Sequence, residues 1–131
     1  MNPDLRLHHC AKRITSGSLD FVLALFEQLG CRVAYRPEGD TFAIVEQSGL
    51  PVLLQFIERQ QTPASTIEKR ESHIAFVSHH PANEIERIKE WVNQQGKKFV
   101  SGSWSDKERY FDCPEIFIDF VVEILHVSVV E

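Results

Sequence analysis

The sequence lacks the features that mark several large classes of protein. It has only three cysteines, Cys10, Cys31 and Cys113, and they lie far apart in the chain. An odd number at this spacing fits neither a disulfide framework nor a zinc motif, so we expect a protein of the reducing cytoplasm. The sequence also shows no glycine-rich nucleotide loop and no serine or cysteine nucleophile motif.

Basic residues and long apolar runs are also scarce. The 14 Lys and Arg residues against 19 Asp and Glu give a formal charge of −5, and no basic stripe stands out, so we expect no nucleic-acid partner. The most apolar stretch, Ile116 to Val130, is interrupted by Asp119, Glu123 and His126. It is shorter than the roughly 20 residues of a membrane helix, so we expect a buried strand and no membrane partner. Met1 to Arg6 does not resemble a signal peptide.

The composition that remains is that of a folded domain. Hydrophobic residues make up 43% of the 131 residues and charged residues 25%. This balance allows a sizeable core and argues against disorder. We therefore expect one domain that covers residues 1–131.

The first half predicts one strand, one helix and three further strands. Apolar residues recur at helical spacing after Ser16 or Ser18, and Gly30 can end that helix. The expected elements are a strand from Leu5 to Ile14, a helix from Ser16 to Gly30, and strands from Cys31 to Arg36, Thr41 to Glu46 and Pro51 to Glu58. They form unit one, about residues 5–58.

The second half repeats this order after a polar linker at residues 59–70. Its expected elements are a strand from Ser72 to Val77, a helix from Pro81 to Gly96, and strands from Phe99 to Trp104, Glu108 to Cys113 and Ile116 to Val127. They form unit two, about residues 71–131. His9 and His73 lie 64 residues apart, and each precedes a helix-ending glycine by 21 or 23 residues. The predicted fold is α+β, with two β-α-β-β-β units forming a curved mixed sheet around a cavity.

This pattern resembles the vicinal oxygen chelate superfamily, which includes glyoxalase I, bleomycin-resistance proteins and extradiol dioxygenases. The resemblance is carried by His9-Cys10-Ala11, Leu29-Gly30, His73-Ile74-Ala75-Phe76 and the turn Asp112-Cys113-Pro114-Glu115, with Asp119 seven residues after Asp112. It implies a divalent metal ion bound by His9, His73 and Asp119. In the glyoxalase and epimerase branches a fourth ligand comes from the position that Gln55 matches. The resemblance also implies a homodimer.

Strand alternation gives these residues a chemical meaning of their own. His73 and Asp119 fall on the inward faces of their strands, and Gln55 shares a face with Leu53 and Ile57. Two His and a carboxylate leave open positions on a metal ion, which can then hold two adjacent oxygens of a substrate. We therefore predict a glyoxalase-like lyase or isomerase acting on a small oxygenated substrate. Glu123 is the one nearby acid-base candidate, and we expect it at the rim.

Plainer interpretations of the same residues stay open. A lone inward His is often a hydrogen-bonded core residue, Gln55 can be structural, and His8 competes with His9 for the inward position. The turn before the last strand lacks the superfamily's glycine, and Asp119 stands where its members usually have Glu. These departures favour an alternative function, a metal-free protein of the bleomycin-resistance type that binds or sequesters a small molecule.

Overall fold

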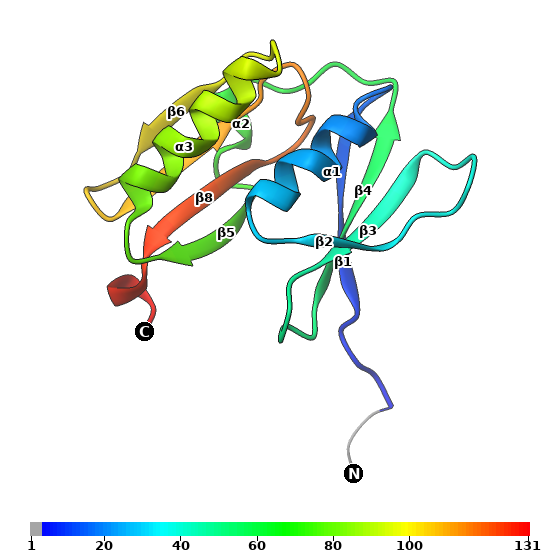
Figure 1. Cartoon of the computed structure of the whole chain (residues 1–131), viewed down its shortest axis with the longest axis horizontal. Coiled ribbons are helices and arrows are strands. Elements are labelled where there is room, and N and C mark those ends of the chain that lie inside the picture. Colours follow the sequence, from blue (N-terminus) through cyan, green and yellow to red (C-terminus); the bar gives the residue numbers. More distant parts are fainter. Residues whose placement is uncertain (1–3) are drawn as a thin grey trace. The chain divides into compact units, whose positions relative to one another are not determined.

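The computed structural model describes residues 4–131, and these divide into two compact units. The first unit ends at Gln60 and the second begins at Gln61. Each unit contains a four-stranded mixed sheet and a main helix, which makes the fold α+β (Figure 1). None of the helices in the described part of the chain has the length and apolar character needed to span a membrane.

Unit 1 has the predicted β-α-β-β-β order. Its elements are β1 (His9–Thr15), α1 (Leu19–Gln28), β2 (Arg32–Tyr35), β3 (Phe42–Glu46) and β4 (Leu53–Arg59). The strands lie in the order β1-β4-β3-β2, with β1 and β4 parallel and the other pairs antiparallel. The first and last strands of the unit are therefore direct neighbours.

Unit 2 repeats this arrangement after one extra turn of helix in the linker. Its elements are α2 (Thr66–Lys69), β5 (His73–Ser78), α3 (Pro81–Gln94), β6 (Val100–Ser103), β7 (Glu108–Asp112), β8 (Val121–His126) and a 3₁₀ turn (Val127–Val129). The strand order is β5-β8-β7-β6, and β5 is parallel to β8. The repeat predicted from the sequence is confirmed.

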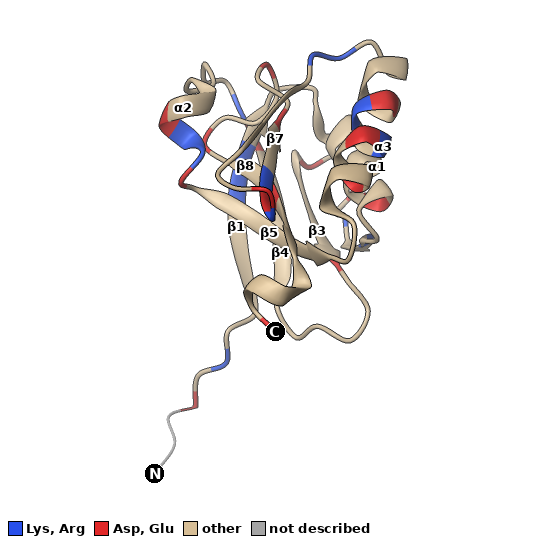
Figure 2. Ribbon diagram, turned by 90° about the vertical axis from the view of Figure 1, so that its left-hand side faces the viewer, with Lys and Arg blue, Asp and Glu red and all other residues tan. Residues whose placement is uncertain are grey.

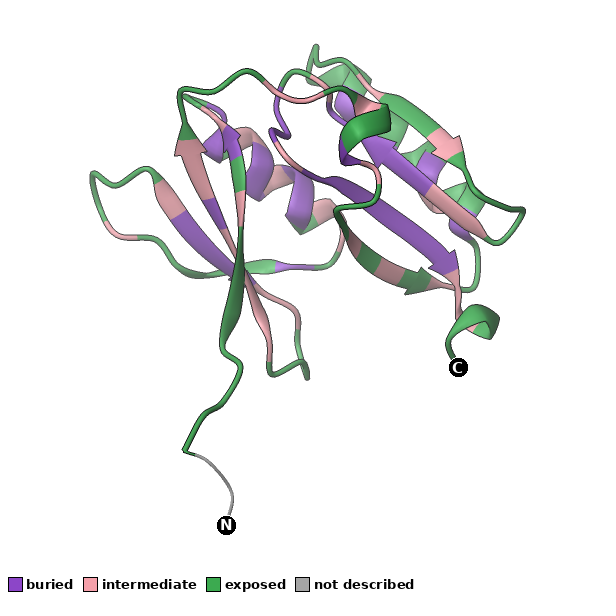
Figure 3. Ribbon diagram, turned by 180° about the vertical axis from the view of Figure 1, so that it is seen from behind, coloured by how far each residue is buried: buried purple, intermediate pink, exposed green. Residues whose placement is uncertain are grey.

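Each main helix buries one face against the sheet of its own unit. In unit 1 the ring of Phe26 on α1 packs against Phe56 on β4, with ring centroids 4.5 Å apart. In unit 2 the buried residues of α3 recur every three or four positions, at Ile85, Ile88 and Val92, while the charged residues of the helix lie between them (Figure 2). Figure 3 shows the central strand β8 buried over nearly its whole length and the edge strand β5 alternating.

Both main helices end close to the predicted glycines. The chain turns at Gly30 and Gly96, which have φ angles of 90° and 74°. Only glycine adopts such angles freely, so these residues stop the helices within one turn. The helices are nevertheless shorter than the ranges 16–30 and 81–96 that the sequence predicts.

Two predicted strand starts are wrong by four residues or more. The first strand begins at His9 rather than Leu5, and the side chains of Leu5 and Leu7 are 84% and 72% exposed. The last strand begins at Val121 rather than Ile116.

The late start of β8 has a local cause in the turn that precedes it. The Cys113 carbonyl accepts hydrogen bonds from the amides of Ile116 and Phe117, which folds the chain into a turn directly after β7. The apolar residues that follow, including Ile118 and Phe120, are buried in this connection without belonging to a ladder. An apolar run here therefore signals burial and not a strand.

A carboxylate from β4 caps the N-terminus of α1. The Ser18 side chain at the N-cap position bonds back to the carbonyl of Thr15 and does not cap the helix. Instead Glu58 accepts a hydrogen bond from the Leu19 amide at 2.9 Å. A negative charge at this end also interacts favourably with the helix dipole. The contact ties α1 to the strand that follows three elements later.

We predict that Glu58→Ala lowers the free energy of unfolding by about 1 kcal/mol, because an N-terminal amide of α1 loses its acceptor. Glu58→Gln should have a smaller effect, since it keeps an acceptor oxygen and loses only the charge. Urea denaturation measures both. Glu38→Ala, in an exposed turn of the same unit, is the matched control, and an equal loss there would contradict the capping role.

Candidate functional site

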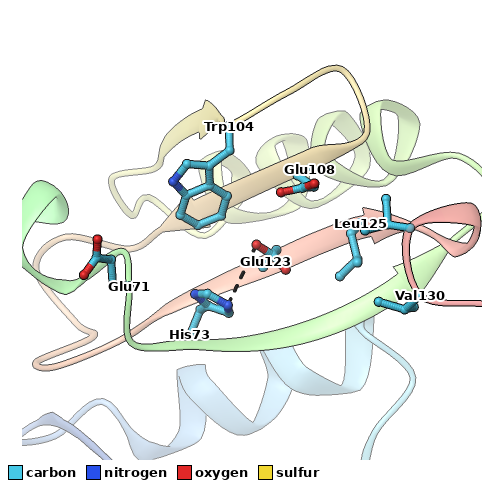
Figure 4. Close-up of a pocket in the computed structure, with 8 residues that line it drawn as sticks. Glu71, His73, Trp104, Glu108, Glu123, Leu125 and Val130 are labelled. Atoms are coloured by element: carbon cyan, nitrogen blue, oxygen red, sulfur yellow. Dashed lines mark ion pairs between the residues drawn. The ribbon is translucent and has the colours of Figure 1, made fainter.

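A pocket of about 530 Å³ lies on the sheet of unit 2 (Figure 4). Its lining comes from the segment before β5, from strands β5, β7 and β8, from the end of β6 and from the C-terminal turn. The lining residues are Glu71, His73, Trp104, Glu108, Glu123, Leu125, Val129 and Val130. The pocket is thus built from unit 2 alone and combines carboxylates with aromatic and apolar walls.

His73 is held in one orientation at the start of β5. Its Nδ1 lies 3.0 Å from the Arg70 carbonyl oxygen. A carbonyl can only accept, so Nδ1 must carry the proton of this hydrogen bond. The other ring nitrogen, Nε2, then points toward Glu123 in the pocket (Figure 4).

Glu123 stands opposite this Nε2 atom. The register pairs His73 with Val121 and Ala75 with Glu123, so His73 and Glu123 point to the same face of neighbouring parallel strands. Their nearest atoms, His73 Nε2 and Glu123 Oε2, are 3.8 Å apart. Glu123 is only 9% exposed and points into the pocket (Figure 4), so the rim position expected from the sequence is corrected.

The surroundings of Glu123 disfavour its charge. Burial raises the pKa of this carboxyl group above its ordinary value, and Glu108 raises it further, while His73 lowers it. A carboxylate that is costly to ionise and lies in a cavity is a frequent feature of functional sites.

Trp104 forms one wall of the pocket and is in tilted contact with two other aromatic rings. The Trp104 ring lies 5.5 Å from the ring of His73 and 4.7 Å from that of Tyr110, between centroids. Tyr110 in turn lies against Gly102 on β6, where a Cβ atom would collide with the tyrosine ring. The glycine therefore makes room for the ring that supports Trp104.

A buried ion pair anchors the segments that carry His73 and Glu123. Lys69 Nζ lies 3.0 Å from Asp112 Oδ1, and both side chains are almost fully buried. Thr66 donates a 2.6 Å hydrogen bond to the other carboxylate oxygen, and Lys69 donates to the carbonyl of Phe117. The cluster joins α2, the end of β7 and the connection that leads into β8.

The ion-pair cluster is also close to the site in sequence. Arg70, whose carbonyl orients His73, follows Lys69, and the Ser72 amide bonds to the Lys69 carbonyl at 3.0 Å. The Ser72 carbonyl in turn accepts from the Val121 amide, at the start of β8. The same buried pair therefore fixes where both site strands begin.

Unit 1 carries two of the predicted metal ligands in a matching arrangement. His9 is paired with Leu53, and Ala11 with Gln55, so His9 and Gln55 share one face of the unit 1 sheet. Each unit thus has a His at the start of its first strand and a polar residue two positions beyond the partner of that His. His8 lies just before β1, and its Nδ1 is 3.0 Å from that of His9.

Asp119 occupies a different kind of position. It is half-buried in the connection before β8, two residues ahead of the strand. The residue that matches Gln55 in the repeat is Glu123. The sequence carries this signal, because Leu-Leu-Gln-Phe-Ile-Glu at 53–58 and Val-Val-Glu-Ile-Leu-His at 121–126 have the same order of apolar and polar residues.

Residues 4–131 contain no group of three or more His, Cys, Asp or Glu side chains gathered closely enough to hold a metal ion. The His73–Glu123 pair supplies two atoms of the kind that bind metal ions, His73 Nε2 and Glu123 Oε2.

Comparisons with known proteins add a structural relationship. The sequence matches no protein-family model and no curated protein. Solved structures match along nearly the whole chain. A lactoylglutathione lyase from Agrobacterium tumefaciens is 12% identical with a TM-score of 0.55, and the match covers 99% of this chain and 98% of that one. A fosfomycin resistance protein from Mesorhizobium loti is 14% identical, with 95% and 92% covered and a TM-score of 0.54.

A third structure, a bleomycin-binding protein in complex with bleomycin, is 13% identical, with 95% and 98% covered and a TM-score of 0.52. The fold is that of the vicinal oxygen chelate proteins. The resemblance inferred from the sequence is confirmed at this level. Within the vicinal oxygen chelate fold these proteins have different activities by name, so the fold alone does not select one. A homodimer and a cytoplasmic location stay predictions.

We predict that Lys69→Met destabilises the protein by about 3–5 kcal/mol, because it leaves the Asp112 carboxylate buried without its cation. The double variant Lys69→Met/Asp112→Leu should recover most of this loss, since neither charge is then buried. Urea denaturation tests both. The control is Lys98→Met, which removes an exposed pair with Glu115 and should change stability by less than about 1 kcal/mol. Equal losses for the two lysines would contradict the anchoring role.

Proposed function

We propose that this protein binds a divalent metal ion through His73 and Glu123 and acts as a lyase or isomerase on a small oxygenated substrate. The observation that carries the proposal is the approach of an imidazole nitrogen and a carboxylate within one pocket. His73 Nε2 lies 3.8 Å from Glu123 Oε2, and the Arg70 carbonyl holds the other ring nitrogen. Imidazole and carboxylate are common ligands of divalent metal ions, and a cation between them would offset the cost of burying the Glu123 carboxylate.

The residues fit a metal ion in type and spacing. Two ligands of a tetrahedral ion, each about 2.1 Å from it, lie about 3.4 Å apart. The observed 3.8 Å is close to this separation. The hydrogen bond from Nδ1 to the Arg70 carbonyl is the outer support that metal-binding His residues usually have, because it fixes both tautomer and ring orientation.

The internal repeat extends this proposal to unit 1. His9 and Gln55 hold the same register positions as His73 and Glu123. They keep their place in the proposed ligand set, as the sequence analysis has it. Asp119 is the carboxylate of the sequence prediction, and Glu123 is the carboxylate that the repeat favours. The name of one similar structure, a lactoylglutathione lyase, supports a lyase reaction.

The chain's own residues have distinct parts in this proposal. His73 and Glu123 hold the ion, which when bound would polarise the substrate's oxygen atoms as a Lewis acid. Trp104 shields one side of the site from water. Glu108, at the start of β7, lines the same pocket and is the carboxylate placed to exchange a proton with a bound substrate.

We predict that Glu123→Gln and His73→Ala each lower the affinity for nickel, zinc, manganese or iron at least tenfold, because each removes a donor. Metal affinity is measured by calorimetry on protein first stripped of metal. Asp119→Asn and His79→Ala are the matched controls and should change the affinity less than threefold.

The two carboxylate variants show whether Glu123 or Asp119 is the carboxylate that binds the metal ion. A loss of affinity in Asp119→Asn with none in Glu123→Gln would restore the sequence prediction and reject the repeat-based assignment. Wild-type protein that takes up none of the four metals would reject the metal proposal itself.

The pH dependence of metal binding follows from the raised pKa of Glu123. A metal ion binds the ionised carboxylate, so protons compete below the pKa and affinity falls as the pH is lowered through it. Because that pKa is raised, the fall should begin at a higher pH than for an ordinary glutamate. Glu108→Gln removes one cause of the shift and should move the profile to lower pH. An unchanged profile would contradict the coupling of the two carboxylates.

The walls of the pocket favour a second candidate, a metal-free protein that binds or sequesters a small molecule. Leu125, Val129 and Val130 give the pocket an apolar side, which suits ligand binding without chemistry. One similar structure is named as a bleomycin-binding protein. A metal-free binding protein should bind its small molecule equally well with and without a chelator. Under the metal proposal, a chelator should weaken that binding.

A further inference from the structure

The turn that follows β8 forms part of the pocket wall. Residues Val127–Val129 make a 3₁₀ turn directly after the strand. Val129 and Val130 line the pocket of unit 2, and Val130 lies on the same side of the cavity as Leu125 (Figure 4). Val129 and Val130 are 41% and 61% exposed, so apolar burial alone holds them only weakly. The position of this turn decides how far one side of the pocket is closed.

A side chain at the end of β8 holds the turn in place. The Ser128 amide donates a hydrogen bond to Nδ1 of His126 at 3.0 Å, and the Ser128 hydroxyl oxygen lies 2.7 Å from the same nitrogen. The amides of Val130 and Glu131 bond to the Val127 carbonyl, within the turn itself. In the part of the chain that the structure describes, His126 is therefore the one side chain outside the turn that is hydrogen-bonded to residues 128–131.

These contacts fix the proton on the His126 ring. An amide N–H can only donate, so Nδ1 is the acceptor and carries no proton. The ring is then neutral, with its proton on Nε2, and the Ser128 hydroxyl can donate to Nδ1 as well. When an imidazole takes up a second proton, both of its nitrogens become donors. A protonated His126 therefore cannot accept from the Ser128 amide, and the turn loses its cap.

Imidazole is the side chain that makes this change near neutral pH. Because only the neutral ring of His126 can cap the turn, the cap is complete on the alkaline side of the transition. It is lost as the pH falls through the transition, since protons then bind preferentially to the uncapped form.

The surroundings of His126 contain other groups that carry or change charge. The ring of His79, which follows β5, lies edge-on to the ring of His126, with centroids 6.3 Å apart. It is the titratable side chain in ring contact with His126, so the test must separate the two. The further charged or titratable residues on the adjoining segments are His80, Glu84, Lys107, Glu108 and Glu131.

We infer that His126 is a pH-dependent latch for this wall of the pocket. The neutral ring caps the turn and keeps Val129 and Val130 at the cavity. On acidification the imidazolium releases the Ser128 amide, and the turn is free to move away from the pocket. His126 is neither a proposed metal ligand nor a lining residue, so the latch controls entry to the pocket whichever ligand the pocket takes.

The first test observes the ring of His126 itself. Long-range nitrogen-15 NMR spectra of the whole chain, prepared without metal, distinguish protonated from unprotonated ring nitrogens. We expect a proton on Nε2 and none on Nδ1 on the alkaline side of the transition, and protons on both nitrogens on the acidic side. A His126 ring that carries its proton on Nδ1 at alkaline pH would overturn the inference.

The second test observes the turn and the pocket wall. The hydrogen-exchange protection factor of the Ser128 amide should fall about fivefold between about pH 8 and about pH 5, as expected for the loss of a cap. Over the same range the methyl signals of Leu125 should be broadened more strongly by TEMPOL, an uncharged paramagnetic probe, because the wall opens. Protection and broadening that stay constant across this range would contradict the latch.

Three variants assign the pH dependence to one ring. His126→Asn keeps an acceptor for the Ser128 amide but does not titrate, so protection should be retained at both pH values. His126→Ala removes the acceptor, so protection should be low at both. His79→Asn is the matched control and should keep the wild-type pH dependence. The inference would be overturned if His126→Asn still lost protection on acidification, or if His79→Asn abolished the effect.

Discussion

The parallel pairing of the first and last strand of each unit is the constraint on which the rest of the structure depends. It places β4 beside β1 and β8 beside β5, so that chain segments from the two ends of a unit become neighbours. Paired residues of parallel strands point to the same face. The register therefore decides which polar side chain lies near the His that begins the first strand of the unit: Gln55 in one unit and Glu123 in the other.

The repeat and both main helices could be predicted from the sequence because their signals are local. Apolar spacing defines α1 and α3, and Gly30 and Gly96 end them. The carboxylate partner of His73 could not be found in the same way. Counting seven residues from Asp112 leads to Asp119, but the turn after Cys113 keeps that residue out of the strand. Comparing β4 with β8 leads to Glu123, because the two units keep the same strand register. A count that starts from a turn is less reliable, because the length of a turn can vary.

Unit 2 contains two buried carboxylates with different surroundings. Asp112 is fully buried, pairs with Lys69 and accepts a hydrogen bond from the Thr66 hydroxyl, and it anchors α2. Glu123, one strand away, lines the pocket, where it lies 3.8 Å from His73 and near a second carboxylate, Glu108. A buried charge that is fully enclosed by its partners stabilises the fold, whereas a charge that borders a pocket can also meet a ligand.

The same parallel pairing has a consequence for how the chain acquires its structure over time. Closing β1 onto β4 joins His9 to Leu53 across 44 residues, and closing β5 onto β8 joins His73 to Val121 across 48. Such distant closures slow folding, because chain entropy is lost before the contacts form. The two closures follow one another along the chain and do not interleave. The first can therefore be completed on the ribosome while the residues of the second are still being synthesised.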